Sequence, residues 1–347
     1  MTLPTPATSR GSEYAQLSGL IKQANLLRRR PGYYLAKIVV TAGLFVAGWV
    51  GFGLLGSSWY QLLIAAFLAI AFTQVAFLGH DAGHRQIFAS RKANDLLGFV
   101  HGNLLVGLSF GWWIDKHARH HAHPNAEGAD PDIGDGALAF THDQARGRRS
   151  ALGRLFTRSQ SWLFFPLLLL EGLNLHVASV RSLLDGSQRR HSRPVEAVLL
   201  AVHAGAYLTA VFLVLSPWQA IAFLAVQQGL FGLYMGASFA PNHKGMPTFS
   251  ATDKIDYLRR QVLTSRNVRG GRLTDFALGG LNYQIEHHLF PSMPRPNLRR
   301  AQALVRGYCA GRGIPYREET LLSSYAQTLR HLGDVGRSAR PAATLGQ

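Results

Sequence analysis

Two pairs of long uncharged stretches constrain this 347-residue chain more than any other feature. Residues 38–57 and 60–79 contain no Asp, Glu, Lys or Arg, and neither do residues 197–216 and 218–240. A helix needs about 20 apolar residues to cross the hydrocarbon core of a bilayer. Only a short turn separates the two members of each pair. The sequence therefore predicts an all-α integral membrane protein with four transmembrane helices in two hairpins.

The charges fall outside these four stretches. The chain carries 36 Lys and Arg against 19 Asp and Glu, a formal net charge of +17. The hairpin turns are uncharged and the hairpin bases are basic, so the positive-inside rule predicts a multi-pass protein with both termini in the cytoplasm. A nucleic-acid-binding protein has no need of such long stretches without positive charge. We therefore expect no nucleic-acid partner and expect membrane lipid instead.

Two further apolar stretches, residues 96–114 and 161–180, are interrupted by glycines or polar residues. Basic residues flank residues 161–180 on both sides, which requires an even number of membrane crossings. We expect both stretches to be interfacial or re-entrant helices.

The remaining segments complete the predicted organisation. We expect a single domain over residues 1–332, in which residues 80–196 and 241–332 form a cytoplasmic helical cap. Residues 1–30 and 333–347 are rich in small and polar residues and in arginine, and are predicted to be flexible.

The histidines cluster at the predicted ends of the spans, on the cytoplasmic side. His80 and His84 are four residues apart, which places them one turn apart on the same face of a helix. His117 and His121 repeat this spacing, and His120 is turned about 100° from His121, toward a second metal. Of the 15 histidines, the candidate metal ligands are His80, His84, His117, His120, His121, His243, His287 and His288.

This set of side chains indicates a di-metal centre. Imidazole binds zinc, copper, iron and nickel well, but a structural zinc takes four ligands and does not need eight. The chain contains neither His-Glu-x-x-His nor Glu-x-x-His, which disfavours a zinc protease and a carboxylate-bridged di-iron bundle. The lone Cys309 excludes an iron–sulfur cluster held by this chain. Iron is the natural metal if the task is oxygen activation, and a site at the membrane suggests a lipid substrate.

Four strings of residues carry a family resemblance. They are HDAGH at 80–84, GWWIDKHARHHAHPN at 111–125, FAPNHKG at 239–245 and LNYQIEHHLFPSMPRPNL at 281–298. In this order they resemble the three histidine boxes of membrane fatty-acid desaturases. The string QIEHHLFP, with Gln284 opening the third box, is similar to front-end desaturases of the Δ5/Δ6 type. The resemblance runs from about residue 60 to 332.

The resemblance implies an O2-dependent acyl desaturase. Its two iron ions are held by the seven box histidines and His243, O2 is the co-substrate, and a cis double bond is introduced into an acyl-CoA or a membrane acyl-lipid. Metal-bound imidazoles donate their other N–H to nearby acceptors, and Asp81, Asp115 and Glu286 are the candidates by adjacency. Gln284 is either a weak ligand or a neighbour of the ligands. Trp112 and Trp113 are candidates for the lining of a substrate tunnel.

The electron supply is predicted to be separate. The His-Pro-Gly-Gly haem motif of a fused cytochrome b5 domain is absent, and the 37 residues before the first span are too few for that domain. We expect electrons from a separate ferredoxin or flavin-dependent reductase. The candidates for an exposed basic face that docks an acidic donor or a headgroup are Arg295, Arg299, Arg300 and Arg306.

Three alternatives remain open. A di-iron lipid hydroxylase or ketolase of the same superfamily would share the box spacing. A membrane metal transporter would place its ligands near the middle of the spans, where only His203 lies. A membrane b-type haem protein would pair histidines of facing helices within the bilayer.

Overall fold

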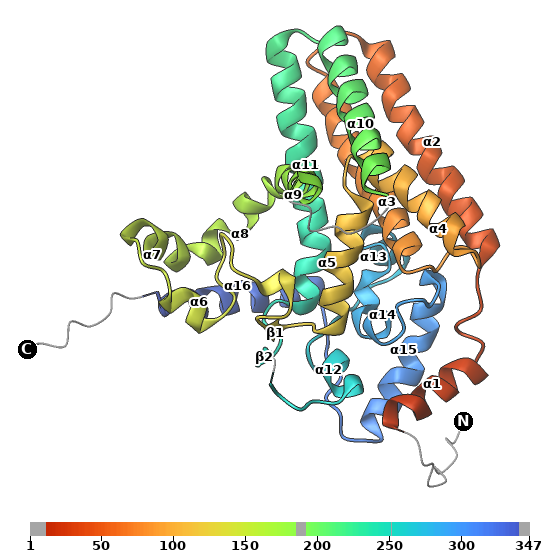
Figure 1. Cartoon of the computed structure of the whole chain (residues 1–347), viewed down its shortest axis with the longest axis vertical. Helices are drawn as coiled ribbons and strands as arrows, with labels where there is room; N and C mark the ends of the chain where they lie inside the picture. Colours follow the sequence, from red (N-terminus) through yellow and green to blue (C-terminus); the bar gives the residue numbers. More distant parts are fainter. Residues whose placement is uncertain (1–11, 185–191, 251, 340–347) are drawn as a thin grey trace, which may run out of the picture.

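The computed structural model describes residues 12–184, 192–250 and 252–339, and this part of the chain is mainly helical (Figure 1). Its strands are two residues long and form two parallel pairs. β1 (Ala126–Glu127) pairs with β2 (Phe249–Ser250), and β3 (Asn267–Val268) pairs with β4 (Glu318–Glu319). Each pair joins segments that are far apart in the sequence.

Within the described ranges, four helices are long and apolar enough to cross a membrane: α2 (Pro31–Leu55), α3 (Gln61–Gly83), α10 (Arg193–Val214) and α11 (Pro217–His243). They stand together as a bundle at one end of the molecule (Figure 1), which confirms the predicted all-α class with four such helices. α2, α3 and α11 are longer than their uncharged stretches, because hydropathy marks the apolar part of a helix and not its capped ends.

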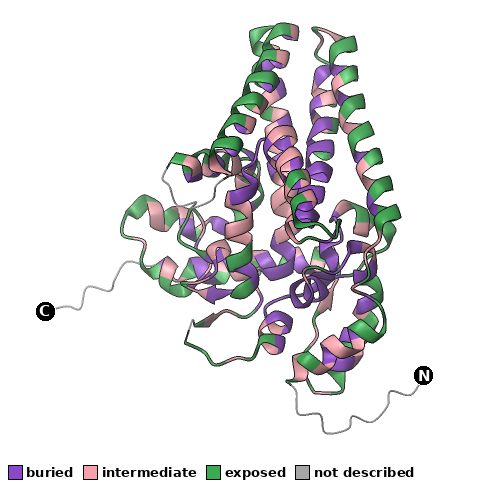
Figure 2. Ribbon diagram, turned by 45° about the vertical axis from the view of Figure 1, so that its right-hand side comes forward, coloured by how far each residue is buried: buried purple, intermediate pink, exposed green. Residues whose placement is uncertain are grey.

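The bundle presents apolar side chains outward. Leu54 is 85% exposed, Leu213 80% and Trp218 76%, and Figure 2 shows exposed residues along the outer faces of the long helices, with buried ones between them. Exposed apolar patches of this extent mark a surface that contacts lipid or another protein. The bundle is therefore compatible with a membrane environment.

The two interrupted stretches form bent helix pairs. α4 (Arg91–Gly98) continues into a π-helix, η1 (Phe99–Val106), and then turns by 112° into α5 (Phe110–Ala122). Gly107, at φ +81, allows this turn because glycine adopts positive φ at little cost. α8 (Gln160–Leu168) and α9 (Glu171–Leu184) meet at 72°. Bent pairs of this kind are compatible with re-entrant or interfacial helices, which remain a prediction.

The predicted flexible ends are partly wrong. α1 (Glu13–Gln23) packs Leu17 and Ile21 against α15 (Arg295–Ala310), and α16 (Leu321–Arg337) buries Leu332 and Val335. Composition alone misled here, because a few correctly spaced apolar residues are enough to dock a helix. Residues 1–11 and 340–347 lie outside the described residues.

The remaining short helices build a cap at one end of the bundle (Figure 1). They are η2 (Pro131–Ile133), α6 (His142–Arg146), α7 (Ala151–Arg158), α12 (Tyr257–Leu263), α13 (Arg272–Ala277), η3 (Leu281–Tyr283) and α14 (Gln284–Leu289). The cap has its own apolar core, which includes Val262, Leu289 and Leu298. The candidate site lies where this cap meets the ends of α3 and α11.

Candidate metal centre

The eight predicted histidines come from four elements that converge at the junction of bundle and cap. α3 ends at the first box, α5 carries the second, α11 ends at His243, and α14 carries the third. The structure brings the histidines together in two adjoining groups, one of His80, His84, His117 and His287 and one of His120, His243 and His288. Within each group the candidate ligand atoms all lie within 4.8 Å of one another. His121 lies between the groups: its ring centroid is 4.1 Å from that of His288, on which it stacks, and 4.7 Å from that of His84.

In the first group and beside it, ring nitrogens approach one another closely. His117 Nε2 lies 2.9 Å from His84 Nε2 and 3.0 Å from His121 Nε2. Two nitrogens that bind the same ion at about 2.1 Å are about 3.0 Å apart when the angle between the two bonds at the ion is 90°. These distances are compatible with ligation of a common ion, and they equally fit hydrogen bonds between the rings.

In the second group, each ring is oriented from behind by an oxygen atom. His120 Nδ1 lies 3.0 Å from Asp130 Oδ1, His243 Nδ1 3.0 Å from the Thr264 carbonyl oxygen, and His288 Nδ1 3.0 Å from Gln261 Oε1. Each oxygen accepts, so each imidazole donates from Nδ1 and keeps the Nε2 lone pair for another partner. Such acceptors fix the tautomer and orientation of metal-binding histidines.

Several of these nitrogens are buried without a hydrogen bond. Within the described residues, His80 Nε2, His287 Nε2 and His288 Nε2 have no hydrogen-bond partner. An unsatisfied buried polar atom costs about 1–3 kcal/mol. Ligation of a metal ion would satisfy all three atoms, so the residues present fit a histidine-bound metal centre.

The electrostatics favour ligation as well. Burial, and secondarily the neighbouring imidazoles, hold the pKa values of His117, His121, His287 and His288 well below the ordinary histidine value. Histidine must be neutral to bind a metal. These rings therefore meet that requirement at neutral pH without the loss of a proton.

Two of the four predicted neighbours of the ligands lie against them. Asp81 Oδ1 is 3.4 Å from His80 Nδ1, and Gln284 Nε2 is 2.9 Å from His243 Nε2. Because His243 donates from Nδ1 to the Thr264 carbonyl oxygen, its Nε2 accepts from the Gln284 amide, which therefore lies against the second group.

Glu286 differs from the adjacency argument. Glu286 accepts hydrogen bonds from Asn267 Nδ2 and Tyr316 OH, both at 2.7 Å, and thereby joins α14 to β3 and to the segment before β4. Burial raises the pKa of Glu286 to about 7. Asp115 is half-buried on α5, and the carboxylate that holds the His120 ring belongs to Asp130 instead. Successive helical residues point about 100° apart, so the residue beside a ligand in sequence usually faces away from it.

Sequence reasoning missed Asp130, Gln261 and Thr264. The signal for Asp130 was weak but present, since Asp130 and Asp132 follow the second box at a proline turn. Nothing in the sequence marked Gln261 or Thr264, which act from α12 and its C-terminal end.

The predicted tunnel residues lie on α5 beside the histidines. The Trp113 ring stacks on His117 with centroids 4.5 Å apart, and a Cβ at Gly83 would come within 2.5 Å of it. Glycine at this position thus lets α3 approach the indole closely. Trp112 is half-buried beside it. The lining of a substrate tunnel by these two residues remains a prediction.

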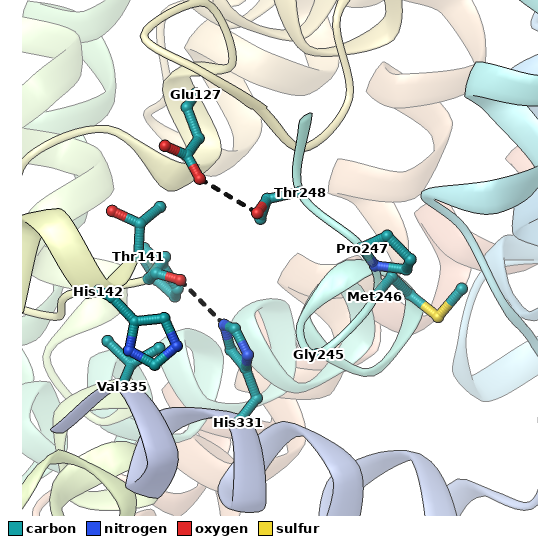
Figure 3. Close-up of a pocket in the computed structure, with 10 residues that line it drawn as sticks. Glu127, Thr141, His142, Gly245, Met246, Pro247, Thr248, His331 and Val335 are labelled. Carbon is teal, nitrogen blue, oxygen red and sulfur yellow. Dashed lines mark hydrogen bonds between the residues drawn. The ribbon is translucent and has the colours of Figure 1, made fainter. Parts of the chain in front are cut away.

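A cavity of about 390 Å³ lies away from the two histidine groups. Glu127, Thr248 and His331 line it, and Figure 3 shows the hydrogen bond between Glu127 and Thr248 and the one that His331 makes. His331 was not predicted to be a ligand, and its ring nitrogen lies 2.9 Å from the Phe140 carbonyl oxygen. None of the residues that line the cavity is one of the eight candidate ligands.

The four apolar helices and the two histidine groups together define a helical protein of membrane type with a candidate histidine-rich metal site. Residues 57–320 match the family "Fatty acid desaturase", and the chain belongs to this family.

Curated relatives agree with this assignment. The chain is 27% identical to the acyl-lipid (9-3)-desaturase of Physcomitrium patens, over 97% of this chain and 64% of the relative. It is 30% identical to a Δ5 fatty acid desaturase of Caenorhabditis elegans, over 94% of this chain and 74% of the relative. It is 32% identical to a Δ8 fatty acid desaturase of Euglena gracilis, over 89% and 75%. The chain thus spans about two thirds to three quarters of the length of these relatives.

Proposed function

We propose that this chain is a front-end fatty acyl desaturase, which introduces a cis double bond into an acyl chain carried by CoA or by a membrane lipid. One observation carries the proposal: two adjoining histidine groups lie where four apolar helices meet a cap. Three of their buried ring nitrogens have no hydrogen-bond partner within the described residues and are available to bind a metal ion. The relatives named as Δ5 and Δ8 desaturases support the front-end type.

The metal we infer is iron, at two positions. His80, His84, His117 and His287 would hold one ion, and His120, His243 and His288 the other, with His121 between them. When bound, the iron pair would supply the O2 chemistry needed to remove two hydrogens from adjacent methylenes, which no amino-acid side chain can do alone. All donors in this set are imidazoles, which suit iron among other transition metals.

The chain's own residues orient the site. Asp130, Gln261 and the Thr264 carbonyl each hold one imidazole in a fixed orientation. The Trp113 ring stacks on His117, and Gly83 of α3 packs closely against the same indole. Such fixed supports keep a site ready for reaction.

We further infer that the centre faces the cytoplasm and draws its two electrons from a separate ferredoxin or flavin-dependent reductase. The basic residues at the cap end support this orientation under the positive-inside rule. Cys309 is buried and cannot contribute to an iron–sulfur cluster without further cysteines.

The test is expression in a host that lacks polyunsaturated fatty acids, with and without added linoleate. Gas chromatography–mass spectrometry of derivatised lipids should show a new double bond on the carboxyl side of an existing one. A hydroxylated lipid without a new double bond would instead establish a hydroxylase. Unchanged lipids from an iron-loaded enzyme with a competent electron donor would overturn the proposal.

A further inference from the structure

Arg295 lies in the interior, although the sequence predicted it on an exposed basic face. It is 6% exposed, whereas Arg299 and Arg306 of the same helix are 54% and 57% exposed. Arg295 Nη2 lies 2.8 Å from Asp81 Oδ2 and donates to the Phe77 carbonyl oxygen at 2.9 Å. The first residue of α15 is thereby joined to the end of α3, next to the first histidine box.

The surroundings of Arg295 are shaped for it. Gly280, at φ +78, packs against the arginine stem, and a Cβ there would come within 2.5 Å of Arg295 Cγ. The Tyr34 hydroxyl accepts a hydrogen bond from the Arg295 backbone N–H at 3.2 Å. Both contacts restrict where the guanidinium can lie.

The other oxygen of Asp81 faces a candidate ligand. Asp81 Oδ1 lies 3.4 Å from His80 Nδ1, while His80 Nε2 has no hydrogen-bond partner within the described residues. The His80 ring lies 5.0 Å from the ring of His117 and 4.9 Å from that of His287. A continuous line of contacts therefore runs from Arg295 through Asp81 to the first histidine group.

Simple stabilisation is a weak explanation for this arrangement. Burial of two charges costs desolvation energy that offsets much of their attraction, so a buried ion pair adds little net stability compared with apolar residues of similar size. An acceptor behind a metal-binding imidazole, by contrast, commonly changes metal affinity by about 10- to 100-fold.

We propose that Arg295 is a positioning residue for the metal centre, which fixes the Asp81 carboxylate so that it orients the His80 ring toward the first group. The inference rests on the proposed function, because it requires that this group binds a metal. Arg295 itself does not touch the metal or the substrate in this arrangement.

The test measures metal binding separately from activity. The purified full chain is titrated with Fe²⁺ under anaerobic conditions, and bound iron is counted by mass spectrometry. Arg295→Met should weaken binding of one of the two ions by about 10- to 100-fold, and Arg295→Lys should recover part of the loss. The ligand-field spectrum of Co²⁺-loaded protein should change in Arg295→Met. Arg330→Met, at an exposed position of α16, is the matched control and should match the wild type in both readouts.

A double variant separates positioning from folding, since Arg295→Met alone leaves Asp81 as an unpaired buried charge. Asp81→Asn/Arg295→Met removes both charges and should fold but still bind one ion weakly. Wild-type affinity in the double variant would show a structural pair only and overturn the inference, as would wild-type affinity in Arg295→Met. A wild-type chain that binds no metal would overturn the proposed function, and this inference with it.

Discussion

Ser109 donates a 2.7 Å hydrogen bond from its hydroxyl to the Glu196 carboxylate, which joins the start of α5 to the start of α10. The same carboxylate oxygen accepts from the Gly111 backbone N–H at 3.0 Å and from Asn103 Nδ2 at 3.2 Å. A carboxylate at a helix N-terminus also interacts favourably with the helix dipole. α5 carries the second histidine box, with three of the candidate ligands. This buried contact at its start therefore helps to fix the position of the helix that carries them.

Replacement of Glu196 by Ala should destabilise the fold by roughly 1–3 kcal/mol, because it leaves buried donors without their acceptor. The thermal midpoint in detergent should fall, and less iron should be bound. Glu171→Ala is the control, since that side chain is only half-buried and bonds to Asn174. An Ala variant as stable as the wild type would show that the contact carries little of the attachment of α5.

Asp130→Ala should weaken iron binding at the second group by about 10- to 100-fold, because it frees the His120 ring. Anaerobic iron titration checks the affinity, and the desaturation product should fall in parallel. Asp143→Ala changes an exposed carboxylate on the neighbouring helix α6 and should have no effect. Equal losses in both variants would contradict a specific role of Asp130.

The long helices and the histidine pairs His80/His84 and His117/His121 could be predicted because each depends on local spacing. An uncharged run of about 20 residues and an i, i+4 pair of histidines need no knowledge of distant contacts. The acceptors behind the rings could not be predicted in this way. Gln261 reaches His288 from α12, and Arg295 reaches Asp81 from the first residue of α15. Such contacts depend on how helices pack, which a single sequence does not display.

Arg295 illustrates the limit most clearly. Its neighbours Arg299 and Arg300 are exposed, so the local composition predicted a basic surface along the whole segment. Arg295 comes first in α15, where the chain leaves the third box, and there the side chain meets Asp81. Its burial follows from the position of α15 against α3, not from its residue type.

Addition of Fe²⁺ to metal-free protein should raise its thermal midpoint, and a chelator should reverse the shift. An ion that binds only the folded state stabilises it by about 2.7 kcal/mol at 100 times its dissociation constant. His120→Ala should reduce both the shift and the product while leaving membrane insertion intact. His331→Ala, outside both histidine groups, should keep the full shift. A shift of wild-type size in His120→Ala would refute its assignment as a ligand.

Cys309 should resist alkylation in the folded protein. The residue is fully buried on α15, and burial raises the pKa of its thiol to about 11. The ordinary thiol pKa is about 8.5, and the thiolate is the reactive form. At pH 8.5, iodoacetamide should label the denatured chain rapidly and the folded chain very slowly, as mass spectrometry can measure. Because the folded pKa is the higher one, the stability contributed by this thiol is complete below about pH 8.5 and declines as the pH rises toward 11. Rapid labelling of the folded wild type at pH 8.5 would show that α15 opens readily and that its contact with α1 is weak.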